Sequence, residues 1–278
     1  MKSLRLTVPT IAVMLVVAGC GSSAQPTPLQ PITHTAVLPT VPPVSLPADK
    51  PTPTVPVPNP QPYKAFPAPC PDGTLEGRYT FVQMQSFANC AVALVSNFIT
   101  ASYKRMPPPA AVYYIAQGKI GNEPCIDETG APGTFNDVSY EYCPVDNKIY
   151  IGQAELWEFY HGIGDAAPIV GLAHEWGHLI QTQTGVPAPT DNVESVNHEN
   201  QADCVAGAFV AYVGAKNWLE YPADVGDIAG LLQEIASAET ASRTHGTLEE
   251  RSKSLSMGIK GGLFACNSFY PETHIYNG

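Results

Sequence analysis

Prolines between Gly21 and Pro69 set the strongest limit on what this chain can fold into. The stretch contains 15 of the 28 prolines, as in the run PTPTVPVPNPQP. Proline has no backbone N–H and a fixed φ, so a segment this rich in it forms neither helices nor sheet ladders. We therefore interpret residues 20–69 as a disordered, extended proline-rich linker, in preference to a ligand for a partner domain. Residues 70–278 remain for one folded domain, and roughly 200 residues are enough for a substantial core.

The first residues have the layout of an export signal. Lys2 and Arg5 precede an apolar run at residues 11–17, which is too short to span a bilayer. The sequence VAGC, which ends at Cys20, is similar to a bacterial lipobox. That resemblance implies a signal peptide at residues 1–19 and a Cys20 that carries acyl chains such as palmitate, which would anchor the protein at the extracytoplasmic face of the cell membrane. In the alternative, an ordinary signal peptide is cut near Gly19 and Cys20 has no role.

The charge of the chain excludes one class of partner. The formal net charge is −11 at pH 7, whereas nucleic-acid binding depends on basic surface that neutralises phosphates. We therefore expect no nucleic-acid partner. Anionic lipid headgroups would also repel this charge, so membrane contact would depend on the lipid at Cys20.

The remaining cysteines predict disulfides. They are six in number, which allows 15 pairings, and they are Cys70, Cys90, Cys125, Cys143, Cys204 and Cys266. An even number of cysteines in an exported chain indicates structural disulfides. Their order in the sequence suggests the pairs Cys70–Cys90, Cys125–Cys143 and Cys204–Cys266. No CxxC pair occurs, which argues against a cysteine zinc site or a thioredoxin-like role.

The pattern of apolar residues and turn formers predicts an α+β fold that is mainly helical, with a small β-sheet early in the domain. We expect strands at residues 110–117 and 147–152. The residues between 118 and 138 contain Gly, Pro, Asn and Asp and are interpreted as a loop. Helices are expected at residues 81–103, 154–162, 165–184, 195–212, 225–241 and 248–259, the third of them capped by Asp165 with Pro168 in its first turn.

The third of these helices contains the sequence GLAHEWGHLI. His174 and His178 are one helical turn apart, so both imidazoles project from the same face. Zinc accepts imidazole nitrogens in tetrahedral geometry. Glu175 is offset by one residue, so it cannot easily share the ion but can reach a water beside it. This HExxH arrangement predicts two Zn²⁺ ligands, His174 and His178, with Glu175 as general base.

A further ligand is expected from the segment ENQAD, which begins at Glu199. Glu199 and Asp203 are separated by one helical turn and share a face. One carboxylate can complete the zinc site, while the other can accept the outer N–H of a ligand histidine. His198 is a competing ligand, although it points about 100° away from Glu199 on the same helix. The metzincin pattern HExxHxxGxxH does not fit, because Gln and Thr occupy its last two positions.

An HExxH followed by ExxxD resembles the gluzincin metalloproteases. The fuller set of motifs, in order, resembles the bacterial family of putative neutral zinc metallopeptidases: YCPVDNKIYI, HEWGHLIQ, ENQADCVAGAF, HGTLEER and CNSF. The resemblance spans roughly residues 125–269. It implies a zincin-like metalloprotease domain, Glu199 as the third ligand, Asp203 as partner of a ligand histidine, and a strand edge that binds an extended substrate. The long proline-rich lipoprotein leader departs from the family pattern.

These features predict a membrane-tethered, zinc-dependent peptidase that acts on protein or peptide substrates. The tetrahedral intermediate needs a second electrophile besides the metal, and His245, Arg243 and Tyr142 are the candidates. One alternative is a non-catalytic surface lipoprotein with a structural metal site. The other is a cell-wall amidase that uses the same zinc chemistry.

Overall fold

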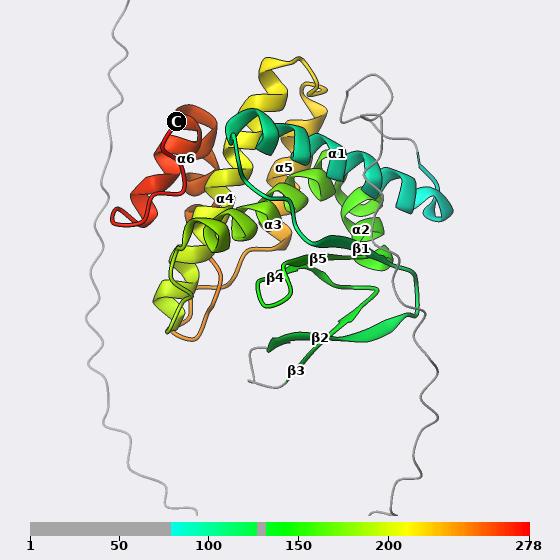
Figure 1. Ribbon diagram of the computed structural model, residues 1–278. Helices are drawn as coiled ribbons and strands as arrows, with labels where there is room; N and C mark the ends of the chain where they lie inside the picture. The colour runs from blue at the N-terminus through cyan, green and yellow to red at the C-terminus, as the bar shows by residue number, and fades with distance from the viewer. Residues whose placement is uncertain (1–78, 127–131) are drawn as a thin grey trace, which may run out of the picture. The chain divides into compact units, whose positions relative to one another are not determined.

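The computed structural model describes residues 79–126 and 132–278 (Figure 1). The chain divides into two units, Met1–Thr54 and Val55–Gly278, and the first of them lies wholly outside the described residues. The predicted signal peptide, the proline-rich linker, Cys20 and Cys70 also lie outside the described residues. None of the described helices is long and apolar enough to cross a membrane.

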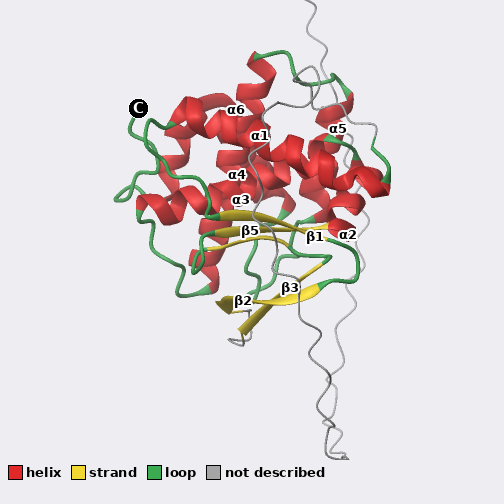
Figure 2. Cartoon of the chain, turned by 45° about the vertical axis from the view of Figure 1, so that its right-hand side comes forward, coloured by secondary structure: helices red, strands yellow, loops and turns green. Residues whose placement is uncertain are grey.

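The described domain is mainly helical, as predicted (Figure 2). A short 3-10 turn at Phe81–Gln83 leads into α1, and α2 continues into a π-helical turn at Glu158–Ile163. The HExxH motif, with the flanking residues 171–180, lies in the middle of α3, which packs against α1, α4, α5 and β4. The helices are α1 Met84–Ser102, α2 Gln153–Trp157, α3 Ala166–Thr184, α4 Asn192–Ala215, α5 Ala223–Glu234 and α6 Leu248–Cys266.

The ends of two helices differ most from the prediction, by about seven residues each, and α4 is longer than predicted at both ends. Helix α5 ends at Glu234 rather than near residue 241, because the following chain turns to pair with a later segment, with Ser237 N donating to Gly246 O. Helix α6 continues to Cys266, across a kink at Gly262. Asp165 occupies the N-cap of α3 as predicted, although its side chain makes no capping hydrogen bond.

A three-stranded sheet precedes α3 in the chain. It contains β1 Ala111–Ile115, β5 Lys148–Gly152 and β4 Tyr140–Cys143, in that spatial order. Strand β1 runs parallel to β5, and β4 runs antiparallel to it, with Tyr142 opposite Ile149. Strand β4 is therefore an edge strand, and it packs against α3. The helices lie on one side of this sheet (Figures 1 and 2).

The prediction of a loop at residues 118–138 is wrong. This segment forms a hairpin of β2 Ile120–Ile126 and β3 Pro132–Asn136, which lies on the other side of the sheet from the helices (Figures 1 and 2). The register shifts between Asn122 and Ile126, and this irregularity accommodates a proline in a strand. Gly121 is required where it is, because a Cβ there would collide with the Phe135 ring.

The disulfides follow the predicted order as far as the described residues extend. Cys125–Cys143 joins the hairpin to β4, and Cys204–Cys266 joins α4 to the end of α6. Cys90 is also disulfide-bonded, and its partner lies outside the described residues. The pairing of Cys70 with Cys90 stays a prediction.

Helices α4 and α6 approach each other unusually closely. A Cβ at Gly258 would collide with the carbonyl oxygen of Cys204, and one at Gly207 would collide with that of Leu255. These glycines are therefore needed for close backbone contact rather than for an unusual φ. With the disulfide nearby, they fix the position of the first half of α6 against α4.

Candidate metal centre

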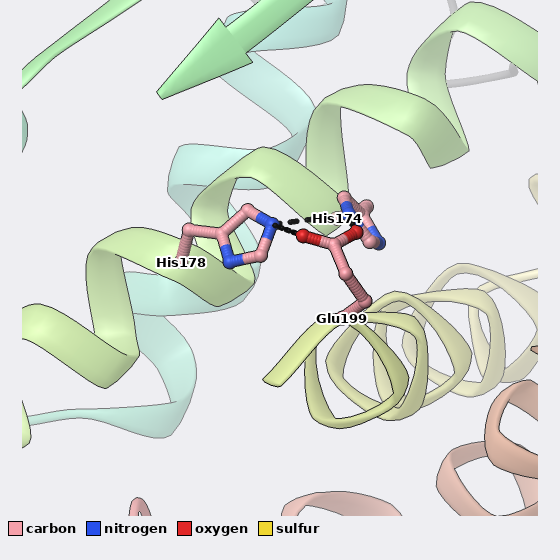
Figure 3. A group of neighbouring side chains, drawn as sticks. All are labelled: His174, His178 and Glu199. Carbon is pink, nitrogen blue, oxygen red and sulfur yellow. Dashed lines mark hydrogen bonds and ion pairs between the residues drawn. The ribbon is translucent and has the colours of Figure 1, made fainter. Parts of the chain in front are cut away.

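Two helices bring the predicted ligands together. His174 and His178 project from α3, and Glu199 projects from α4 toward both imidazoles (Figure 3). One donor atom of each residue lies within 4.8 Å of the others, so the three could hold a metal ion. His174 is buried, and the other two are partly buried at the side of a cleft.

The spacing of the donor atoms suits zinc. His174 Nε2 lies 3.1 Å from Glu199 Oε2 and 3.2 Å from His178 Nε2. His178 Nε2 lies 3.2 Å from Glu199 Oε1. Ligands placed about 2.0–2.1 Å from a tetrahedral zinc ion are about 3.3–3.4 Å from one another. Glu199 approaches the two imidazoles through different oxygens, so these distances describe contacts among the three residues and not one triangle of three atoms. Two imidazole nitrogens and a carboxylate at such short spacing are a donor set that suits zinc.

The Nδ1 atoms of both histidines have hydrogen-bond partners within the protein. His174 Nδ1 is 2.8 Å from Asp203 Oδ1, and His178 Nδ1 is 2.8 Å from Gln181 Oε1. Both acceptors favour the tautomer with a proton on Nδ1, which leaves the Nε2 lone pairs for a metal. Asp203 therefore lies where the resemblance placed it. Gln181 has an orienting contact that the sequence prediction did not assign, although its position three residues after His178 puts it on the same face.

A buried arginine contacts two carboxylates of the site, those of Asp203 and Glu199. Arg251, on α6, is 2 % exposed and donates from Nη1 to Asp203 Oδ1 and Oδ2 at 3.1 and 3.2 Å. Its Nη2 lies 3.6 Å from Glu199 Oε2. The sequence prediction overlooked Arg251 and considered Arg243 instead. Arg251 belongs to the quoted run HGTLEER, so the motif contained it.

The electrostatics of the site favour a cation. Burial lowers the pKa of His174, but the carboxylates of Asp203 and Glu199 outweigh that effect and raise it to about 10. Burial raises the pKa of Glu199, but the imidazoles of His178 and His174 hold it well below its usual range. A proton or a metal ion between the imidazoles is therefore favoured, and the two compete for the same nitrogens.

Glu175 faces the same cleft but is not one of the three clustered donors. Its side chain is 9 % exposed, and its Oε2 accepts a hydrogen bond from Tyr142 N, on β4, at 2.8 Å. Burial raises its pKa, although the neighbouring imidazoles of His174 and His178 act in the opposite direction. The carboxylate is thus held in place by the edge strand and is more basic than an exposed glutamate.

The three candidates for a second electrophile are placed differently. His245 lines the cleft, with Nε2 3.6 Å from Glu199 Oε2. The Tyr142 hydroxyl donates to Asn147 Oδ1 at 3.0 Å. Arg243 forms ion pairs with Glu239 and Glu250 and does not line the cleft. Among the three, the side chain of His245 reaches the donor cluster.

His198, the competing ligand, lies beside the cluster rather than in it. Its ring stacks on that of His178, with centroids 5.4 Å apart and planes 11° apart. Burial lowers its pKa to about 4, with a further contribution from the neighbouring His178. His198 packs against a ligand and is absent from the clustered donors found in the described residues.

The cleft at this site has a volume of about 390 Å³. No match to the chain was found among the curated proteins or among the solved structures. Residues 87–269 match the model of the family described as putative neutral zinc metallopeptidase, and because this match covers well over half of the chain, the protein belongs to that family.

Proposed function

We propose that the protein is a zinc-dependent peptidase that hydrolyses peptide bonds in the cleft beside His174, His178 and Glu199. The observation that carries this proposal is the convergence of His174, His178 and Glu199, whose donor atoms lie within 4.8 Å of one another, with Glu175 lining the same cleft. Zinc held there would lower the pKa of a water molecule and polarise the scissile carbonyl. Among the described residues the cluster has three ligands rather than four, which favours catalysis over a structural metal.

Glu175 is the general base of this mechanism. It accepts the proton of the attacking water and passes it to the leaving amine. Its raised pKa improves it as a base, and the hydrogen bond from Tyr142 N keeps the carboxylate facing the cleft. The peptide N–H of an edge strand therefore orients the catalytic carboxylate.

Asp203 and Gln181 orient the two imidazoles rather than meeting the substrate. Each accepts from an Nδ1–H and so keeps the Nε2 atoms directed at the common point. His245, which is 43 % exposed in its side chain, is placed to donate to the oxyanion that forms on the substrate carbonyl.

The decisive experiment is Glu175→Gln. The variant keeps the size of the side chain but cannot accept the proton, so kcat on a quenched peptide should fall by about 10²–10⁴-fold. Bound zinc, measured by atomic absorption after dialysis, should stay within a few-fold. Glu249→Gln, at an exposed position of α6, is the matched control and should keep full activity. Equal activity in Glu175→Gln and wild type would exclude a peptidase of this mechanism. Cleavage confined to peptidoglycan stem peptides would favour the amidase alternative.

We also propose that a lipid at Cys20 tethers the enzyme to the extracytoplasmic face of the cell membrane. The support is the VAGC sequence after a short apolar run. Replacing Cys20 with Ser should move the protein from the membrane fraction to the soluble fraction without changing peptidase activity. A Cys20→Ser protein that stays in the membrane fraction would contradict this anchor.

A further inference from the structure

The cleft is lined by residues of two kinds. The polar ones include those of the metal centre, together with Glu141 and Ser237. The apolar ones come from a strand, a π-helical turn and two helices; we call this set the apolar pocket, and it consists of Tyr140, Phe159, Gly171, Leu231 and Ile235. The Tyr140 and Phe159 rings meet edge to face with centroids 5.3 Å apart. Since Tyr140 donates its hydroxyl to Pro168 O, the ring rather than the hydroxyl faces the pocket.

Gly171 is the residue of this pocket that needs an explanation. It lies in the interior of α3, where glycine costs about 1 kcal/mol relative to alanine. A left-handed backbone does not require it, because its φ is not positive. Close helix packing does not require it either, because a Cβ would lie 3.4 Å from Tyr140 Cε1 and 3.9 Å from Leu231 Cδ2, which are ordinary contacts.

Gly177, on the same helix, shows what a packing glycine looks like. A Cβ there would lie 2.8 Å from Ala202 Cα and 2.9 Å from Ala202 Cβ, so α4 leaves no room for it. The space beside Gly171 is instead part of the open cleft. A methyl group would fit in this space, and its absence makes the pocket deeper.

We propose that the apolar pocket binds a large apolar side chain of the substrate, next to the scissile bond, and that Gly171 sets its depth. The inference rests on the proposed peptidase function for the identity of the ligand. Gly171 precedes His174 by three residues and Glu175 by four, so it lies on their face of α3, one turn of about 5.4 Å away. That distance suits a side chain on the residue flanking the reacting carbonyl.

The chemistry of the walls decides which side chains are accepted. Phe159 and Leu231 are buried, at 6 % and 2 % exposure, and neither offers a charge or a hydrogen bond. A charged side chain placed there would lose its hydration without a partner. The pocket therefore favours leucine, phenylalanine or methionine and disfavours aspartate, glutamate and lysine.

The first test is a cleavage profile with a peptide library. Wild-type enzyme should show large apolar residues at one position flanking the cut. Gly171→Ala should reduce the preference for leucine over alanine at that position by about tenfold or more. Gly226→Ala is the matched control, since Gly226 is exposed on α5 and a Cβ there meets no atom within 4 Å. An unchanged preference in Gly171→Ala would overturn the assignment.

The second test does not depend on hydrolysis. Leucine hydroxamate and glycine hydroxamate are titrated into zinc-loaded Glu175→Gln protein by calorimetry. Leucine hydroxamate should bind about tenfold tighter or better, and Gly171→Ala in the same background should remove most of that difference. Equal affinities would overturn the pocket, whatever the library shows. Discrimination between the hydroxamates, together with no peptide cleavage by the wild-type protein, would support the pocket and count against the proposed peptidase function alone.

Discussion

The metal centre and the β-hairpin bury charged groups in opposite ways. At the metal centre the buried carboxylate of Asp203 faces two groups of opposite charge, Arg251 and His174. In the hairpin, the carboxyl of Glu123 is 7 % exposed and its Oε2 has no hydrogen-bond partner. Burial first, and then the like charges of Glu141 and Asp146, raise the pKa of Glu123 to about 7.

The metal centre and the hairpin offset the cost of burying a charge by two different routes. One route pairs the charge, which fixes the geometry that the ligands require. The other route protonates it, which makes the hairpin sensitive to pH. Pairing suits the metal centre, where the ligand geometry must be fixed. Protonation is compatible with the hairpin, where no metal-ligand cluster was found among the described residues.

The largest effect is expected from breaking the paired charges. Arg251→Met removes the guanidinium from a buried ion pair with Asp203 and leaves His174 as its cationic partner, so the free energy of unfolding should fall by about 3 kcal/mol. Chemical denaturation of the zinc-free protein measures this loss. Lys253→Met, at an exposed position of α6, is the control and should change stability little. If Arg251→Met were as stable as the control, the charges would not be coupled as we infer. The double variant Arg251→Met/Asp203→Asn should recover part of the loss.

Removing each of the two described disulfides in turn compares the metal centre with the hairpin. Cys204–Cys266 closes a loop of 62 residues and Cys125–Cys143 one of 18, so their removal should cost about 4 and about 3 kcal/mol. Cys204→Ala/Cys266→Ala should also weaken zinc binding, since Cys204 follows Asp203 on α4. Cys125→Ala/Cys143→Ala should leave zinc affinity unchanged, as measured by competition with a chelator. Equal losses of zinc affinity in both variants would remove the distinction between the regions.

The smallest effect concerns the pH response of the hairpin. A carboxyl whose folded pKa is raised from 4.5 to about 7 stabilises the protein fully below pH 4.5, and this contribution is lost as pH rises through about 7. Glu123→Gln removes this loss and should be more stable than wild type by about 1–2 kcal/mol at pH 8, with no such gain at pH 4. Denaturation of both proteins at the two pH values measures the difference. A gain of the same size at pH 4 would show that ionisation is not its cause.

The metal centre could be predicted because most of it is local. His174, Glu175 and His178 lie within two turns of one helix, and Glu199 and Asp203 within one turn of another, so their spacing fixes the faces on which they lie. The family match confirms the resemblance inferred from these motifs. The contact of Arg251 with Asp203 spans 48 residues and could not be predicted in this way. It depends on the close approach of α4 and α6, which only their packing determines.

The hairpin of β2 and β3 could not be predicted from the sequence, for a related reason. Gly121 and Gly133 lower the strand propensity of residues 118–138, and two prolines, Pro124 and Pro132, interrupt the segment. Its strands are held by pairing with each other and by Cys125–Cys143. A small core of Ile115, Phe135, Cys143 and Tyr150 lies beneath them, and the rings of Phe135 and Tyr150 stack with centroids 4.8 Å apart. Such tertiary contacts override local propensity and are not visible in a window of sequence.

The contact between Gly177 and Ala202 has a consequence for which ion the enzyme can select. Gly177 lies between the two histidine ligands, and Ala202 lies between Glu199 and Asp203, so this contact sets how far the carboxylate stands from the imidazoles. A methyl group at residue 177 would push the helices apart and enlarge the ligand triangle, which would then suit an ion of greater radius. The fit of this site to the proposed zinc ion therefore depends on a residue that has no donor atom.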